Sequence, residues 1–501
     1  MSVIQTQRSE AGAAGHTTSA ITKSLLTGLM LALSLASLDQ NAMTTALPRI
    51  TGELGGLQHL SWVITGFMLA STVSTPLYGS LSDLYGRKPA FAAAISLFLL
   101  GSLLCGIAAS MGQLIVFRIL QGLGAGGLLV LTLTVIADLA EPRERGRYQG
   151  LFAGTFGICA VSGPLLGGVL TQYASWRWIF FINLPLGAAA LALIIRGLKT
   201  SKPVASSRLD VAGIALLTIG TSCLLWSLSS GGSTYAWASA PILTSLAVSI
   251  AALASLVTVE RRAAQPILPP ALFHDRVFLF ASAVLALTGM AMFAVAVYLP
   301  LMLQLLKGLS PSRSGLFMLP MMGGLIVASF TAGRLVSRTG RYKLLPILGL
   351  LAASICVAAL AWAARADLGT PSTIAVLFVL GSGLGLVTPA LTMAIQNAVP
   401  NTIVGAATSI AGFSRSLGAA LGIAIAGAVL AQRLTMLPRN LQSATSGVDR
   451  ISTLPVAQHD RLIGGYRDGF FAVFTFAASM GGLGLIVCLF LPELPIPAKR
   501  G

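Results

Sequence analysis

Long apolar runs separated by short polar segments set the pattern of this chain. Fourteen runs, each about 20 residues long, lie at residues 25–47, 61–81, 90–109, 114–137, 148–170, 178–196, 211–229, 238–259, 278–301, 314–337, 344–364, 371–395, 404–430 and 469–491. A continuous apolar run of this length crosses the hydrocarbon core of a bilayer as one α-helix. The pattern therefore predicts an all-α polytopic membrane protein with fourteen transmembrane helices.

Composition agrees with a membrane protein. Hydrophobic residues make up 55% of the 501 positions and charged residues only 9%, whereas about a quarter of the residues of a soluble domain are charged. The net charge of +17 comes from Lys and Arg scattered singly through the loops, which indicates an orientation signal and no nucleic-acid partner. The five cysteines lie in apolar runs without metal-ligand spacing, so we expect neither a metal site nor a cofactor.

The positive charges also predict how the chain is oriented. With the N-terminus in the cytoplasm, the loops on that side carry most of the basic residues, namely Arg87, Lys88, Arg143, Arg145, Arg147, Arg196, Lys199, Lys202, Arg208, Arg261, Arg262, Arg276, Arg338, Arg341 and Lys343. The short outer loops carry Arg49, Arg177, Lys307, Arg313 and Arg365. Cytoplasmic loops are enriched in Lys and Arg. We therefore expect a protein of the inner (cytoplasmic) membrane with both termini in the cytoplasm.

A short internal repeat indicates two halves. The segments 79–87 and 333–341 follow the second and tenth runs, and Gly, Leu, Gly and Arg recur in them at equal spacing. Parallel repeats of this kind are a transporter architecture. The expected divisions are a cytoplasmic tail at 1–23, a six-helix bundle at 24–197, two inserted helices with flanking loops at 198–277, a second six-helix bundle at 278–492 with a long extracytoplasmic loop at 431–468, and a cytoplasmic tail at 493–501.

The first run contains Asp39, the only acidic residue that lies deep within an apolar run. A charged side chain at the bilayer centre costs about 2.5–3.5 kcal/mol on insertion scales and usually marks an ion or substrate path. Burial disfavours the charged form of a carboxyl group, so we expect Asp39 to hold a proton until a cation or water reaches it. The alternative is a carboxylate near the end of the helix that pairs with a structural Arg.

Two basic residues also lie inside apolar runs. Arg118 in the fourth run is always charged and must find a carboxylate, carbonyl groups or water. We expect it in the proton path, with a purely structural tie between helices as the alternative; direct pairing with Asp39 stays open. Arg415 in the thirteenth run has no obvious acidic partner. A bond to helix carbonyl groups and contact with an anionic ligand are equally open for Arg415.

Polar and methionine side chains within the runs are candidates for a substrate cavity. Methionine adapts to irregular space and to differing ligands, although ordinary packing is the alternative for each residue. The candidates are Gln40, Asn41, Met43, Tyr298, Gln304, Met318, Met321, Met322, Gln396 and Asn397, with Arg415 beside them.

Several motifs resemble a known family. The segment Gly79 to Lys88 resembles the cytoplasmic signature G-x-L-x-D-R-x-G-R-K of the major facilitator superfamily, with Leu84 where Arg is commoner. The residues that resemble its other motifs are Leu114, Arg118, Gln121, Gly122, Gly124 and Ala125 in the fourth run, and Gly150, Gly163, Pro164, Gly167 and Gly168 in the fifth, where Cys159 replaces a Gly. The segments 38–48 and 176–185 resemble those of the fourteen-span drug:proton antiporters, with Thr44 where Asn is usual.

The resemblance implies a fold of two six-helix bundles plus two extra helices, and proton-coupled export of lipophilic or cationic drugs and antiseptics. It implies proton coupling at Asp39 and Arg118, a conformational latch, and an antiporter motif whose glycines allow close helix packing beside a Pro kink. The latch residues are Asp83, Gly86, Arg87 and Lys88, and the antiporter residues are Gly163, Pro164, Gly167 and Gly168. A solvated loop acid is the alternative for Asp83, and ordinary tight packing is the alternative for the glycines.

Two other functions stay open. One is a dedicated exporter of a single metabolite or antibiotic, and the other is a membrane enzyme or sensor. All four His lie in loops or in the N-terminal tail, and no nucleophile–base pair or metal-ligand set appears, so we do not expect an enzyme. The expected partners are drug-like small molecules, protons and the lipid bilayer; a periplasmic adaptor protein stays open.

Overall fold

The computed structural model describes residues 23–54, 60–140, 144–198, 210–231, 235–263, 266–309, 311–366, 369–435 and 456–493. Within these ranges the chain is helical, apart from one isolated bridge between Gly231 and Tyr235. The helices are α2 (Lys23–Leu54), α3 (Leu60–Tyr85), α4 (Arg87–Gly106), α5 (Met111–Leu139), α6 (Arg145–Tyr173), α7 (Trp178–Phe181), α8 (Asn183–Gly197), α9 (Val211–Ser230), α10 (Ala240–Glu260), η2 (Pro270–His274), α11 (Arg276–Lys307), α12 (Pro311–Leu316), α13 (Met318–Thr339), α14 (Leu344–Arg365), α15 (Thr370–Ala398), η3 (Asn401–Ile403), α16 (Val404–Thr435) and α19 (Val456–Leu489).

Twelve helices among the described residues are long and apolar enough to cross a membrane. The short helices α7 and α12 count with α8 and α13, which continue them. The twelve do not include α2 and α3, although these helices contain the first two predicted runs. In α2 the polar residues Asp39, Gln40 and Asn41 interrupt the apolar sequence. The all-helical membrane fold is confirmed, and the count of fourteen spans stays a prediction.

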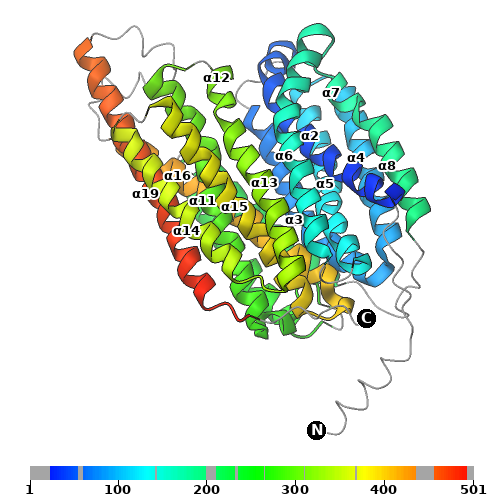
Figure 1. The fold of residues 1–501 in the computed structure, drawn as a ribbon. Coiled ribbons are helices and arrows are strands. Elements are labelled where there is room, and N and C mark those ends of the chain that lie inside the picture. Colours follow the sequence, from blue (N-terminus) through cyan, green and yellow to red (C-terminus); the bar gives the residue numbers. More distant parts are fainter. Residues whose placement is uncertain are drawn as a thin grey trace.

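The described helices form two bundles with the same internal arrangement (Figure 1). In the first bundle α2 packs against α5, α6 and α8, while α4 packs against α5 and α8, and α3 packs against α5. In the second bundle α11 packs against α15, α16 and α19, while α14 packs against α15 and α19, and α13 packs against α15. Each pairing in the first bundle therefore has a counterpart in the second, as expected for an internal repeat.

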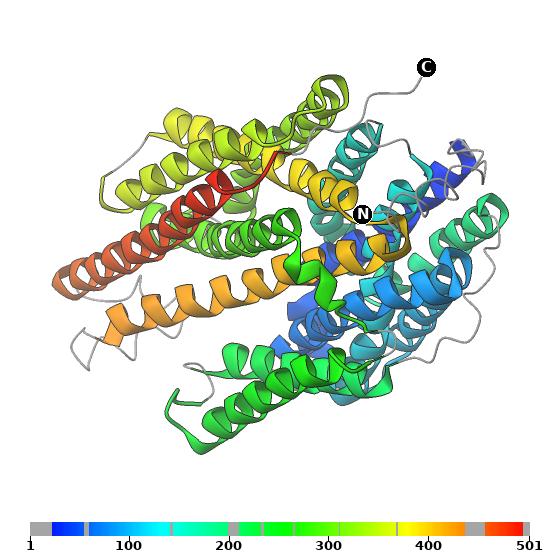
Figure 2. The ribbon, with the colours of Figure 1, turned by 90° about the horizontal axis from the view of Figure 1, so that it is seen from below.

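The hairpin of α9 and α10 lies outside both bundles, along one side (Figure 2). Helix α9 packs against α3 of the first bundle and α16 of the second. Leu217 and Leu256 of the hairpin form an apolar cluster with Leu77 of α3 and Phe413 of α16. The inserted pair therefore covers the seam between the bundles.

Small residues let helices approach closely, both between the bundles and within the first bundle. A Cβ atom added at Gly333 of α13 would lie 1.8 Å from the carbonyl oxygen of Gly146 in α6, so only glycine fits there. Gly163 in the predicted antiporter motif is similar, because an added Cβ would lie 2.5 Å from Cβ of Asn41 in α2. An added Cβ at Gly168 would meet nothing within 4 Å. Close helix approach therefore explains Gly163, and it does not explain Gly168.

Residues 1–22 and 494–501, which contain nearly all of the predicted tails, lie outside the described residues. Both ends of the predicted loop at 431–468 are helical, because α16 continues to Thr435 and α19 begins at Val456. The predicted runs end at polar residues such as Arg433 and Asp468. The helices continue past these residues, because a helix with polar turns can extend beyond the bilayer.

Candidate functional site

Asp39 and Arg118 form an ion pair inside the first bundle, and each residue is 1% exposed. The Nη1 of Arg118 donates to Oδ2 of Asp39 and, at 2.8 Å, to Oε1 of Gln121. Two amides also donate to Oδ1 of Asp39 at 2.9 Å, from Nε2 of Gln121 and Nδ2 of Asn183. Helices α2, α5 and α8 therefore converge on one carboxylate.

Further contacts hold these donors in place. The Ser102 hydroxyl oxygen accepts bonds from Gln121 (2.6 Å) and Asn183 (3.2 Å). The Nε of Arg118 donates to the carbonyl oxygen of Val63 in α3 at 3.3 Å, and the Arg118 guanidinium lies 4.1 Å from the centre of the Phe67 ring. The guanidinium and its amide neighbours thus form one connected network.

The contacts of Asp39 answer one question that the sequence left open. The direct pairing with Arg118, left open by the sequence, is present. Gln121 and Asn183 were not predicted as site residues, although both lie in segments that resemble family motifs. A neutral amide in an apolar run gives a weaker signal than a charge, because it costs less to bury.

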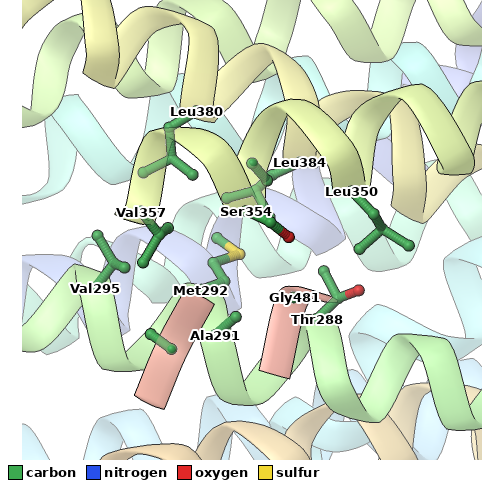
Figure 3. A pocket seen from close by; sticks show the side chains of 12 residues that line it. Thr288, Ala291, Met292, Val295, Leu350, Ser354, Val357, Leu380, Leu384 and Gly481 are labelled. Atoms are coloured by element: carbon green, nitrogen blue, oxygen red, sulfur yellow. The ribbon is translucent and has the colours of Figure 1, made fainter. Parts of the chain in front are cut away.

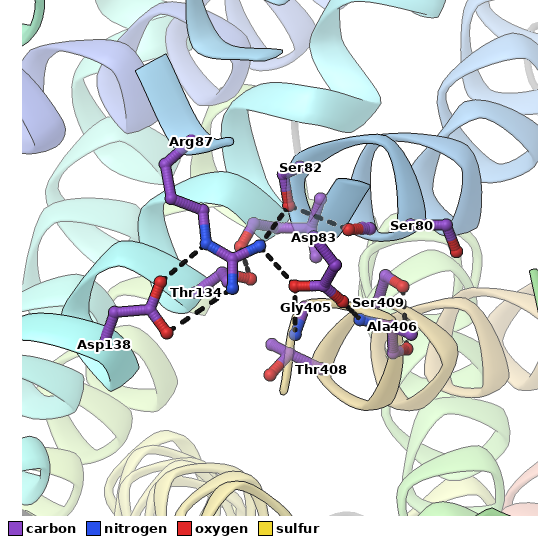
Figure 4. Close-up of polar contacts among 12 residues, drawn as sticks. Ser80, Ser82, Asp83, Arg87, Thr134, Asp138, Gly405, Ala406, Thr408 and Ser409 are labelled. Carbon is purple, nitrogen blue, oxygen red and sulfur yellow. Dashed lines mark hydrogen bonds and ion pairs between the residues drawn. The ribbon is translucent and has the colours of Figure 1, made fainter. Parts of the chain in front are cut away.

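A second polar cluster joins the two bundles (Figure 4). Arg87 of α4 pairs with Asp83 of α3 (2.5 Å) and with Asp138 of α5 (2.6 Å). The carboxylate of Asp83 then accepts bonds from the backbone N–H groups of Gly405 (3.2 Å) and Ala406 (2.8 Å), in the first turn of α16. The first turn of a helix carries free N–H groups and partial positive charge. Asp83 therefore ties the first bundle to the second.

The other predicted latch residues differ in role. Gly86 has a φ of 94°, a conformation that favours glycine, and it allows the sharp connection between α3 and α4. The side chain of Lys88 has no hydrogen bond or ion pair with another described residue. Asp138 belongs to the cluster but was not predicted, because an acid at the end of an apolar run looks like an ordinary solvated residue.

A further contact closes the bundles at the same end, here called the latch end. Nη1 of Arg145 in α6 donates to the side-chain oxygen of Asn397 (2.6 Å) and to the carbonyl oxygen of Gln396 (3.2 Å) in α15. The Gln396 amide donates to the Leu133 carbonyl oxygen and the Thr408 hydroxyl oxygen. Gln396 and Asn397, predicted for the substrate cavity, therefore belong to the closed interface between the bundles.

A cavity of about 500 Å³ lies between the bundles, beyond these closing contacts. Gln40, Tyr298 and Arg415 line it, as predicted, together with apolar side chains. The cavity is also lined by Leu225 and Leu228 of α9. The inserted hairpin is therefore part of the cavity wall.

The other predicted cavity residues lie elsewhere. The side chain of Asn41 donates to the Ser37 carbonyl oxygen of its own helix, and Met43 is fully buried in an apolar cluster. The amide of Gln304 donates to the Ser314 hydroxyl oxygen. The methionines 318, 321 and 322 belong to an apolar cluster of the second bundle. These residues pack helices, and none of them lines the central cavity.

The cavity narrows toward the latch end into an extension of about 140 Å³. Leu129, Phe156, Arg415 and Ser416 line both spaces, and the extension also contains Gln149. Among the described residues that line the two spaces, Arg415 is the one charged side chain, and no Asp or Glu is present.

A separate small cavity inside the second bundle is shown in Figure 3. Its volume is about 10 Å³ and its lining is mostly apolar, with Met292, Leu350, Val357 and Leu384 among the labelled residues. A space of this size holds one water molecule at most. It is a packing defect and not a substrate site.

Comparison with known proteins identifies the family. Residues 29–423 match the protein-family model of the Major Facilitator Superfamily. The chain belongs to the major facilitator superfamily. Members of this superfamily are transporters and not enzymes, so the chain is a multi-pass membrane transporter of small molecules.

Relatives in the superfamily include efflux proteins. The Multidrug transporter protein MdtP of Bacillus subtilis (strain 168) is 37% identical over 82% of this chain and 75% of its own length. Multidrug resistance protein 3 of the same organism is 35% identical over 86% of this chain and 83% of its own length. The crystal structure of the human organic anion transporter MFSD10 (TETRAN) superposes with a TM-score of 0.65 and 15% identity, covering 93% of this chain and 99% of that one. At that identity the likeness shows the fold alone.

Proposed function

We propose that this chain is an antiporter that exports lipophilic drug-like compounds across the cytoplasmic membrane in exchange for protons. The two relatives described as multidrug proteins support drug efflux. The observation that carries proton coupling is the buried Asp39 carboxylate, held by Arg118, Gln121 and Asn183. A titratable group buried in a membrane helix is a candidate proton carrier.

Coupling follows from what a proton does to this network. Protonation of Asp39 removes the negative charge that holds Arg118, so the tie between α2 and α5 weakens. Gln40, the next residue of α2, and Leu129 of α5 line the cavity. A substrate that favours the paired arrangement of α2 and α5 therefore expels the proton, whatever its own charge. Linkage requires that the proton weakens substrate binding by the same factor.

The closed latch end determines which side the cavity faces in this conformation. The contacts of Asp83 and Arg145 join the bundles at that end, and the cavity lies on the other side of them. We propose that the latch end is cytoplasmic, because Arg87, Arg145 and Arg338 lie there. We also propose fourteen spans with both termini cytoplasmic, since α2 and α3 pack among the membrane-crossing helices of their bundle. The described conformation is then the outward-facing one.

The Asp39 network changes the substrate class expected from the sequence. The resemblance to drug:proton antiporters implies lipophilic or cationic substrates, and we expected a cation near Asp39 to displace its proton. Since Arg118 neutralises Asp39 and no acid lines the cavity among the described residues, no free negative charge is available to a cationic ligand. A lipophilic body that fits an apolar cavity is the part of the prediction that we retain.

Transport in proteoliposomes tests the proposal. An imposed pH gradient should drive uphill movement of at least one of three probes: ethidium, 1-pyrenebutanol or 1-pyrenebutyrate. Asp39→Asn keeps the shape but cannot titrate, so it should abolish gradient-driven accumulation. Asp468→Asn, which alters an exposed acid paired with Arg365, is the matched control and should transport normally.

Two outcomes count against the proposal. Gradient-driven accumulation at the wild-type rate in Asp39→Asn would place the proton elsewhere. The second outcome is that wild-type protein moves none of the three probes against its gradient, but transports a single metabolite from a larger panel of compounds. This result would favour a dedicated exporter.

A further inference from the structure

We propose that the narrow extension of the central cavity, between Arg415 and Gln149, binds the anionic head group of amphipathic substrates, so that this transporter carries lipophilic anions such as carboxylates and sulfonates. The inference rests on the proposed function only in that the ligand bound there is the one exported. It is carried by two donors that line one cavity from opposite bundles: the charged guanidinium of Arg415, and the buried amide of Gln149, which has no partner among the described residues.

Arg415 supplies the charge. It is partly buried in α16 and lines both the central cavity and its extension. Its guanidinium has no hydrogen bond or ion pair with another described residue. Its backbone is held against α11, because a Cβ atom at Gly289 would lie 2.3 Å from the Arg415 carbonyl oxygen. A partly desolvated cation without a counter-charge is costly unless a ligand supplies one.

Gln149 supplies a second donor from the other bundle. The residue is 3% exposed, lies in α6 and lines the extension. Its Nε2 is buried and has no hydrogen-bond partner among the described residues. A buried donor left unsatisfied costs about 1–3 kcal/mol. An acceptor placed in the extension satisfies this amide and faces Arg415 at the same time.

Three hydroxyl groups of the extension already donate hydrogen bonds to the backbone. Thr75, Ser329 and Thr392 each donate to a backbone carbonyl oxygen, of Ser71, Gly385 and Thr388 respectively. Their protons are therefore already used. The hydroxyl groups of Thr388, Thr408 and Ser416 also line the extension. The charged donor available to a ligand is the guanidinium of Arg415, together with the amide of Gln149.

The rest of the cavity fits the other half of an amphipathic molecule. The wall of the 500 Å³ space includes Phe67, Met68, Phe156, Phe293 and Tyr298. A volume of this order holds a drug-sized apolar body. The ligand class is therefore an apolar body with one anionic group directed toward the latch end. The head group of an anionic phospholipid shares this chemistry.

Binding to purified protein in an uncharged detergent tests the inference separately from transport. The probes are 1-pyrenebutyrate and 1-pyrenebutanol, which share the apolar body and differ in the head group. Wild-type protein should bind the anion about tenfold more tightly, a difference of about 1.4 kcal/mol. Arg415→Met should lose this preference while its affinity for the alcohol stays within about twofold, and Arg415→Lys should restore part of it. Gln149→Leu should lose part of the preference.

The controls separate the site from folding and from proton coupling. Arg365→Met removes an exposed cation paired with Asp468 and should keep the preference. Thermal unfolding of each variant checks the fold. Asp39→Asn should still prefer the anion, although it fails to accumulate any probe. If wild-type protein binds both probes equally, or Arg415→Met weakens both equally, the inference is wrong even if transport is proton-driven.

A competition experiment with lipids shows whether the site binds an anionic substrate or the head group of an anionic phospholipid. Phosphatidylglycerol and phosphatidylcholine are added to the micelles at equal mole fraction, and transport of 1-pyrenebutyrate is measured in proteoliposomes. Proton-driven transport of the anion supports the inference. Displacement of the probe by phosphatidylglycerol alone, without transport of the probe, assigns the site to a lipid head group and overturns the substrate claim.

Discussion

The bonds of Asp83 should hold the latch end closed, and the structure indicates how much they contribute. Asp83 is the one residue of the Arg87 cluster that bonds across the seam, through the N–H groups of Gly405 and Ala406. Its side chain is 9% exposed, so water screens it little. Asp83→Asn keeps the shape and one acceptor oxygen, and it loses one charged hydrogen bond together with the negative charge at the start of α16.

A hydrogen bond to a charged group contributes about 1.5–3 kcal/mol. The equilibrium between closed and open latch ends should therefore shift toward the open state by about 10- to 100-fold. Spin labels on the exposed residues Glu144 and Thr339, one in each bundle, report the separation of the latch end in a background without native cysteines. Double electron–electron resonance should show a longer-distance population that grows in Asp83→Asn.

Asp138→Asn is the matched control for this experiment. It removes the other carboxylate that Arg87 contacts, but Asp138 lies in α5 and has no contact with α16 in the cluster. The control should leave the distance distribution close to that of the wild type. Unchanged distances in Asp83→Asn, or an equal shift in both variants, would refute the argument that the Asp83 bonds to α16 hold the bundles together.

Two further predictions concern packing and topology. Gly333→Ala should also open the latch end, because the new methyl group meets the Gly146 backbone and overpacking of this kind costs about 1–3 kcal/mol. Gly323→Ala in the same helix, where a Cβ meets nothing within 4 Å, should leave the latch end closed. Equal label distances in both variants would contradict the packing argument. A single cysteine at Ser110 should react with an impermeant thiol reagent in intact cells and one at Thr339 should not; the reverse pattern would overturn the proposed orientation.

The helices were predictable because their length is set by the bilayer. A membrane helix needs about 20 apolar residues, and described helices correspond to all fourteen predicted runs. Their ends were less predictable. The helix that ends at Thr435 extends past the predicted run, because backbone hydrogen bonds form in water as well as in lipid.

The site was predictable where a charge lies within an apolar run. Asp39 and Arg118 were found in this way, since a buried charge needs a partner. The faces of the helices were not predictable. Gln40 and Gln396 are both amides in apolar runs, yet one lines the cavity and the other ties the bundles together. Sequence shows that such a side chain is buried, and only the packed bundle shows which neighbour it meets.

The central claim is that substrate and proton compete through Asp39, and proton release on binding tests it most directly. Purified protein in weakly buffered detergent solution is mixed with 1-pyrenebutyrate, 1-pyrenebutanol or ethidium, and a pH indicator records released protons. The account predicts release from wild-type protein with any probe that it transports, and none from Asp39→Asn, which still binds the probe. Equal release from both proteins would contradict the account.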